Sequence, residues 1–154
     1  MEPQRSEAVC RVASMEELGQ IAGFWEAMLI ECDLVRNPLV PDWRLRFLAE
    51  HTQRLRSGSA RWFVAEATLG LVGSAYAYCD AGIQEAPVGK IAGVYVVPEW
   101  RRRGLARRLT QECLEWLRAQ GCATISLQAS PQGRPLYESL GFTTGNEMRL
   151  DLSR

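Results

Sequence analysis

Residues 94–106 combine an apolar segment, a glycine and several arginines in one short stretch, VYVVPEWRRRGLA. Gly104 follows the arginines and comes directly before an apolar pattern with helical spacing. A strand that enters a glycine turn and then a helix brings unpaired backbone N–H groups, the positive end of a helix dipole and cationic side chains to one point. Gly104 lets another group approach the backbone, and Ala106 does nearly the same. These residues predict a phosphate site that a pyrophosphate would fit.

The spacing of this stretch is more specific than a lone glycine turn. It lacks the Gly-Lys-Ser/Thr ending of P-loop proteins. Its Arg-x-x-Gly-x-Ala pattern, together with the order of elements, resembles the acyl-CoA signature of the GNAT superfamily of N-acetyltransferases, usually written Arg/Gln-x-x-Gly-x-Gly/Ala. Residues 130–142, SPQGRPLYESLGF, resemble the second landmark of that family, Asn-x-x-Ala-x-x-x-Tyr-x-x-x-Gly-Phe. The resemblance covers nearly the whole chain and is most specific from residue 90 to residue 142.

The resemblance implies acetyl-CoA as co-substrate, without a metal. The backbone of residues 94–96 would pair with the pantetheine arm as an added strand does, and one N–H there would polarise the thioester carbonyl. The amides of residues 101–107 would surround the pyrophosphate, with an arginine side chain left for the 3′-phosphate: Arg102, Arg103 or Arg107. The implied cofactor-binding residues are Val94, Tyr95, Val96, Arg101, Arg102, Arg103, Gly104, Leu105, Ala106, Arg107 and Ser130.

The same resemblance assigns Tyr137 as the general acid that reprotonates the leaving coenzyme A thiolate. A phenol with a pKa of about 10 suits that step, although Tyr137 is also explained as a core aromatic. The chain departs from the family pattern at two positions: Ser130 replaces the landmark asparagine, and Lys90 stands where many members carry a glutamate base. The base is therefore unassigned. Glu147 is favoured because it opens the last predicted strand, although a surface carboxylate is the simpler reading, and the other candidates are Glu85, Asp80 and, acting through water, His51.

Composition limits the class of protein. The chain has 154 residues, 47% of them hydrophobic, with 18 basic and 18 acidic side chains, which predicts one soluble domain over residues 1–154. The balanced charge argues against nucleic-acid binding. No apolar leader or membrane-spanning run is found, so we expect a cytoplasmic protein without a membrane partner. Five scattered cysteines and one histidine give little support to a disulfide framework or a metal site.

The elements that position these residues follow from hydrophobic periodicity and turn signals. Strands are expected at residues 8–13, 60–68, 71–79, 90–97, 122–129 and 147–152, and helices at 14–32, 42–57, 102–120 and 133–140. They predict an α/β GNAT-like fold, with a mixed, mostly antiparallel sheet splayed between 90–97 and 122–129 and helices on both faces. The second helix is expected to bury Leu45, Leu48 and Leu55. In that family the first two helices line the acceptor pocket, where Trp25 and Trp43 would shape it and Asp33 and Asp42 would attract a cationic amine.

The expected activity is direct acetyl transfer to a primary amine in a ternary complex, without a covalent enzyme intermediate. The acceptor is left open between a small molecule and a peptide or protein amine. The missing glutamate and Ser130 motivate a second hypothesis, a non-catalytic acyl-CoA-binding module that senses the cofactor or docks to a partner protein. A third, nucleic-acid binding through the arginines, is opposed by the net charge of zero. The resemblance also allows a homodimer, which is common in that family.

Overall fold

The computed structural model describes residues 7–32, 39–83 and 85–152, and its centre is a five-stranded sheet with the strand order β1-β2-β3-β4-β5. The first four strands pair antiparallel with their neighbours, whereas β4 and β5 are parallel. This mixed sheet agrees with the predicted fold. The elements are β1 (Val9–Val12), α1 (Leu18–Glu31), α2 (Trp43–Ser57), β2 (Ala60–Ala67), β3 (Gly70–Asp80), β4 (Val88–Val96), α3 (Leu105–Ala119), β5 (Thr124–Leu127) and α4 (Arg134–Ser139), with short 3-10 turns at Met15–Glu17 and Pro98–Trp100.

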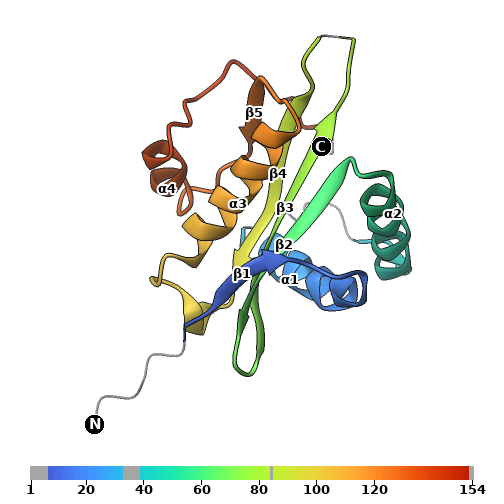
Figure 1. Ribbon diagram of the computed structural model, residues 1–154, viewed down its shortest axis with the longest axis vertical. Helices are drawn as coiled ribbons and strands as arrows, with labels where there is room; N and C mark the ends of the chain where they lie inside the picture. Colours follow the sequence, from blue (N-terminus) through green and yellow to red (C-terminus); the bar gives the residue numbers. More distant parts are fainter. Residues whose placement is uncertain (1–6, 33–38, 84, 153–154) are drawn as a thin grey trace.

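Helices cover the two faces of the sheet as separate layers. Figure 1 shows α3 and α4 on one side and α1 and α2 on the other. The α3 side buries Leu109, Cys113 and Leu117, which recur every four residues on one stripe of the helix. The α1 and α2 side forms a second cluster, in which Ile21 and Trp62 are fully buried. The two hydrophobic clusters share no buried residue, because the sheet separates them.

Strand β4 changes partners along its length. It pairs with β3 as far as Val96, but its pairing with β5 ends at Ile91 opposite Leu127. Beyond that point the β5-facing edge of residues 92–96 is open, as the splayed sheet of the sequence analysis predicts. The register of β4 against β3 also shifts here, as at a β-bulge, and Gly93 has a φ of 61°. A Cβ atom at this position would lie 2.9 Å from the Trp62 ring, so the bulge requires glycine.

The expected terminal strand at residues 147–152 is wrong. Residues 142–152 form no helix or strand, and the alternating side chains of Met148, Leu150 and Leu152 are 82–93% exposed. Alternation makes a segment suitable for one face of a sheet, but a strand also needs a neighbour that accepts its backbone hydrogen bonds. The described part of the chain pairs no strand with this segment.

Helix α2 packs through Leu48 and Leu55 as expected, but the prediction for Leu45 is wrong. Leu45 is 70% exposed, whereas Phe47, which the hydrophobic pattern did not single out, is 6% exposed. Phe47 points at the aromatic side chains Trp25 and Trp62, with ring centroids 5.4 and 6.1 Å away. The tertiary partners of the helix therefore decide which apolar residue is buried. No helix in the described part of the chain is long and apolar enough to cross a membrane.

Candidate active site

The connection from β4 to α3 presents a row of backbone amides with no internal partner. Arg102 and Gly104 have φ angles of 61° and 76°, so α3 starts at Leu105 rather than at residue 102 as expected. The Arg101 amide donates to the Pro98 carbonyl and the Arg108 amide to the Gly104 carbonyl, but no acceptor within the described ranges is found for the amides of residues 102–107. Such amides at a helix N-terminus favour an anion.

These amides lie beside a cavity of about 200 Å³. It contains most of the predicted phosphate site and one residue of α4, Leu136. No atom lies within 4 Å of a Cβ placed on Gly104, so the space above this residue is open. We call this cavity the phosphate cradle. Its lining residues are Val96, Trp100, Arg101, Arg102, Gly104, Leu105, Ala106, Arg107 and Leu136.

The arginines of the turn divide into structural and free side chains. The two Nη atoms of Arg101 donate to both carboxylate oxygens of Glu31, at 2.6 and 2.7 Å, and its Nε donates to the Val96 carbonyl at 2.9 Å. Arg101 thus joins the end of α1 to the end of β4, which leaves its backbone rather than its side chain for a phosphate. Glu31, which the sequence analysis did not select, has its pKa lowered by the Arg101 guanidinium.

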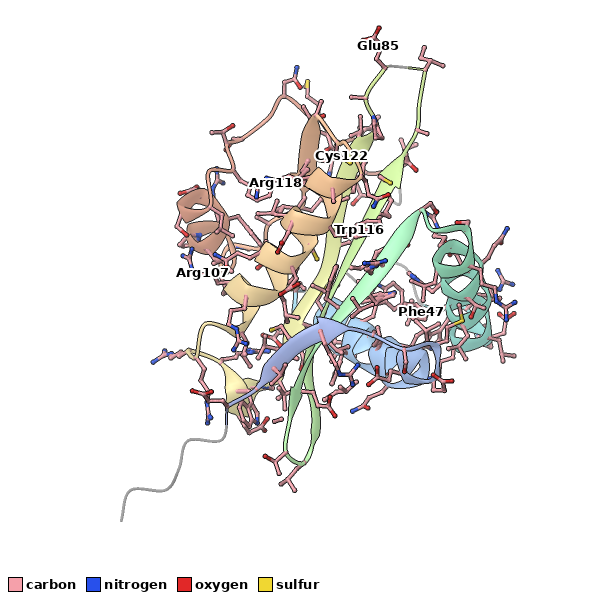
Figure 2. All side chains as sticks on the ribbon, viewed as in Figure 1. Phe47, Glu85, Arg107, Trp116, Arg118 and Cys122 are labelled. Carbon is pink, nitrogen blue, oxygen red and sulfur yellow. The ribbon has the colours of Figure 1, made fainter. Side chains whose placement is uncertain are left out.

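Arg107 and Arg103 are also engaged. The Nη2 atom of Arg107 donates to the Ser139 hydroxyl at 2.6 Å, and Figure 2 shows Arg107 on the side of α3 that faces α4. Arg103 does not line the cradle; its guanidinium lies 4.3 Å from the centre of the Trp100 ring. For Arg102 no side-chain partner is found in residues 7–32, 39–83 and 85–152, which makes it the cradle arginine with a guanidinium free for an anion.

Val94 and Tyr95 lie outside the cradle, on the adjoining open edge of β4. Ser130 precedes α4, and its Oγ accepts the Gly133 amide at 3.1 Å, so that it caps the turn into this helix. In this arrangement the Ser130 hydroxyl keeps its own proton for a further acceptor. The predicted cofactor residues are thus divided among the cradle, the β4 edge and the start of α4.

Tyr137 lies on α4, one residue after the cradle residue Leu136. Its ring packs edge-on against Phe142, with centroids 6.0 Å apart, and is half-buried. The pKa of Tyr137 is raised to about 12, mainly by burial and also by the nearby thiols of Cys113 and Cys32. The phenol is therefore protonated at neutral pH and can donate a proton.

The structure does not place Glu147, the favoured candidate for the general base, at either cavity. Glu147 opens no strand, its side chain is 74% exposed and lies 3.7 Å from Arg149, and it lines neither of the two cavities described here. The reason for preferring it is therefore lost. Asp80 and Glu85 are exposed at the loop between β3 and β4, and Figure 2 shows Glu85 at the tip of that loop. Asp33 lies outside the described residues, and Asp42 accepts a hydrogen bond from Arg46 at 3.0 Å.

His51 is held in a form that cannot accept a proton easily. Its Nδ1 accepts the Trp62 indole N–H at 3.0 Å, so the proton of the neutral ring is on Nε2. Burial lowers the pKa of His51 to about 4, so the ring is neutral near pH 7. Protonation at Nδ1 would break the bond to an indole that can only donate. His51 is therefore a hydrogen-bond donor at this place rather than a base.

His51 lines a second and larger cavity of about 400 Å³, between α1, α2 and the sheet. Figure 2 shows Phe47 on the side of α2 that faces the sheet. Trp25 and Trp43, which the resemblance assigns to an acceptor pocket, line this cavity, and the bulge residues Ala92 and Gly93 form part of its wall. The sequence analysis missed the strand residues Tyr76 and Tyr78, although their alternation on one strand is a signal for a shared face. Among the described residues no cluster of His, Cys, Asp or Glu suits a metal ion.

Comparisons with known proteins agree with this geometry. The model of the Acetyltransferase (GNAT) family matches residues 28–142. Glucosamine 6-phosphate N-acetyltransferase of Trypanosoma brucei brucei is 41% identical over 66 residues, which are 42% of this chain and 45% of that protein. Aminoglycoside N(6')-acetyltransferase type 1 of Acinetobacter genomosp. 13 is 34% identical over 70 residues, 44% of this chain and 47% of the relative. The chain thus spans less than half the length of these curated relatives.

The fold has close counterparts among solved structures. A predicted acetyltransferase from Clostridium acetobutylicum, crystallised with acetyl-CoA, superposes with a TM-score of 0.81 and 20% sequence identity, covering 94% of this chain and 96% of that chain. The family match begins near the end of α1, at residue 28, and ends shortly after α4, at residue 142. It therefore includes both the cradle and the open edge of β4. The chain belongs to the GNAT acetyltransferase family.

Proposed function

We propose that the protein transfers an acetyl group from acetyl-CoA to a primary amine by direct attack, with both substrates bound at once. The observation that carries this proposal is the junction of the open β4 edge at residues 92–96 with the unpartnered amides of residues 102–107. An extended pantetheine arm followed by a pyrophosphate fits an open strand edge that leads into an anion-binding turn. Acetyl-CoA would supply the acetyl group as a thioester.

The cradle and the strand edge bind and polarise the co-substrate in this proposal. The amides of residues 102–107 donate to the pyrophosphate oxygens, and the guanidinium of Arg102 adds a positive charge. Gly104 keeps the cradle open, because it has no side chain and the space above it holds no other atom. A backbone N–H on the open edge of β4 donates to the acetyl carbonyl oxygen, where negative charge develops as the amine attacks.

Tyr137 is the proton donor of the proposed reaction. Its phenol is protonated near pH 7 even at the ordinary pKa of about 10, and burial raises this pKa to about 12, which makes the phenol a weaker acid than a free tyrosine. As the amine nitrogen bonds to the acetyl carbon and the carbon–sulfur bond breaks, the phenol proton passes to the sulfur. The amine enters with its lone pair free and releases its surplus proton to water, and the Tyr137 phenolate recovers a proton from water to complete the cycle. Cys113 does not serve as a nucleophile, because it is fully buried and burial raises the pKa of its thiol.

A calorimetric titration with acetyl-CoA tests the co-substrate first. Desulfo-coenzyme A and ATP serve as controls for the phosphate groups alone. We expect saturable binding of acetyl-CoA, and no binding at millimolar concentration would contradict the cradle assignment. A thiol-release assay with small amines and lysine peptides then tests transfer. Binding without thiol release across the whole panel would refute transfer and favour a non-catalytic acyl-CoA-binding module.

A further inference from the structure

The larger cavity is walled by a continuous series of aromatic rings. Neighbouring rings have centroids 4.7 to 6.1 Å apart, and two of the pairs on the strands are stacked. Flat aromatic walls favour a ligand that presents a flat ring of its own. The rings are contributed by α1, α2, β2 and β3: Trp25, Trp43, Phe47, Trp62, Tyr76 and Tyr78.

The polar groups of this cavity are mostly hydrogen-bond donors. The Tyr76 hydroxyl is buried on a residue that is 6% exposed; the Arg54 guanidinium lies beside it, and among the described residues no group accepts its proton. His51 presents its Nε2–H, because its Nδ1 is occupied by the Trp62 indole. Arg46 and Arg54 add two guanidinium groups. A buried donor without a partner is costly, so a ligand that supplies acceptor atoms is favoured here.

The charge of the cavity points the same way. Among the described residues that line it, Arg46 and Arg54 are positive and Glu50 is the one carboxylate. Both arginines are already paired at Nε: the Glu50 oxygen lies 3.4 Å from the Nε of Arg54, and the Nε of Arg46 donates to Asp42 at 3.0 Å. Their Nη groups are further donors from which a carboxylate can accept, and two guanidinium groups on the wall disfavour a ligand with several positive charges.

The cavity also reaches the proposed transfer site. Ala92 and Gly93 belong to its wall, and the same residues begin the open edge of β4. The Trp62 ring packs directly on Gly93, where a Cβ would lie 2.9 Å from it, so the bulge and the ring form this part of the wall together. A ligand held between the aromatic rings can therefore present an amine to the strand edge.

We propose that the acceptor is a small amine that carries an aromatic ring and a carboxylate, such as an aromatic amino acid. This inference rests on the proposed acetyl transfer and names the substrate class for it. The ring lies between the aromatic walls, and the carboxylate accepts hydrogen bonds from the guanidinium and phenol donors. Polyamines and other polycations are disfavoured by the two guanidinium groups.

Binding and turnover are measured separately, so that failure of this inference is distinct from failure of acetyl transfer. The probes are phenylalanine, phenylalaninamide, alanine and spermidine. Quenching of tryptophan fluorescence measures their binding, and release of the coenzyme A thiol measures their turnover. We expect phenylalanine to bind about tenfold more tightly than its amide, which lacks the carboxylate, and also more tightly than alanine, which lacks the ring. Equal binding of all four probes, or stronger binding of spermidine, would overturn the inference even if acetyl-CoA is bound and used.

Two variants and a matched control assign the effect to the cavity. Trp43→Ala removes one aromatic wall and is expected to weaken phenylalanine binding about tenfold. Arg54→Gln removes a positive charge and should abolish the preference for phenylalanine over its amide. Leu45→Ala alters an exposed side chain of the same helix outside the cavity and should leave phenylalanine binding unchanged. Unchanged binding in both cavity variants would refute the proposed site, whereas quenching without thiol release would support the site and contradict acetyl transfer to this probe.

Discussion

Placing a negative charge in the phosphate cradle should separate electrostatic from steric effects on cofactor binding. We consider Gly104→Glu together with Gly104→Gln, which is nearly the same size and neutral. Both side chains enter open space, since no atom lies within 4 Å of the Cβ position. In both variants a side chain at a φ of 76° lowers the free energy of unfolding by about 1–2 kcal/mol, so the two variants should be equally stable.

The difference between the two variants comes from charge alone. A carboxylate about 4 Å from a phosphate oxygen repels it by about 4 kcal/mol at an effective dielectric constant of about 20. Because about 1.4 kcal/mol corresponds to a factor of ten, we expect acetyl-CoA to bind the Glu variant at least about 100-fold more weakly than the Gln variant. Isothermal titration at low and high salt measures this, and the gap should narrow as salt is added. Equal affinity of the two variants would show that the phosphates do not lie at Gly104.

Three further predictions concern the proton donor, the bulge and the buried histidine. Tyr137→Phe should lower kcat about 100-fold with little change in acetyl-CoA affinity, and an unchanged kcat would remove Tyr137 from the mechanism. Gly93→Ala should reduce the free energy of unfolding by about 2–3 kcal/mol in urea titrations, because the new Cβ meets the Trp62 ring at 2.9 Å and the φ is positive; a loss below about 0.5 kcal/mol would contradict the assigned bulge. The pKa of His51 is depressed to about 4 in the folded state, so its contribution to stability is present above the unfolded pKa of about 6.5 and is lost as the pH falls towards 4. We expect a loss on the order of 2 kcal/mol for this partly exposed ring, and His51→Asn should abolish that part of the pH dependence; an identical pH profile in the variant would refute it.

The cradle was predictable because its cause is local. A glycine between an apolar strand and an amphipathic helix requires only neighbouring residues to form a turn with free amides, although the positive φ angles of Arg102 and Gly104 and the later start of α3 were not anticipated. The partners of its arginines were not predictable. Arg101 binds Glu31, which lies 70 residues earlier, because α1 and the end of β4 meet only in the folded chain.

The aromatic cavity depends still more on tertiary structure. Periodicity places Leu45 on the apolar face of α2, but the aromatic side chains of α1 and β2 select Phe47 instead. At residues 147–152 the alternating pattern predicted a strand, but no described strand lies beside this segment to pair with it. Trp25 and Trp43 were placed near the acceptor by family resemblance, and the rings of Tyr76 and Tyr78 complete the cavity from another strand.

The division of the protein into two hydrophobic clusters has a consequence for its evolution. The cluster under α3 supports the cradle, the cluster under α1 and α2 supports the aromatic cavity, and the sheet keeps them apart. Substitutions among the buried residues of α1 and α2 can therefore accumulate without disturbing the packing beneath the turn before α3, whereas Glu31 is constrained by its bonds to Arg101. The short glycine-bearing segment of β4 is the point where both layers meet, and we expect it to vary least.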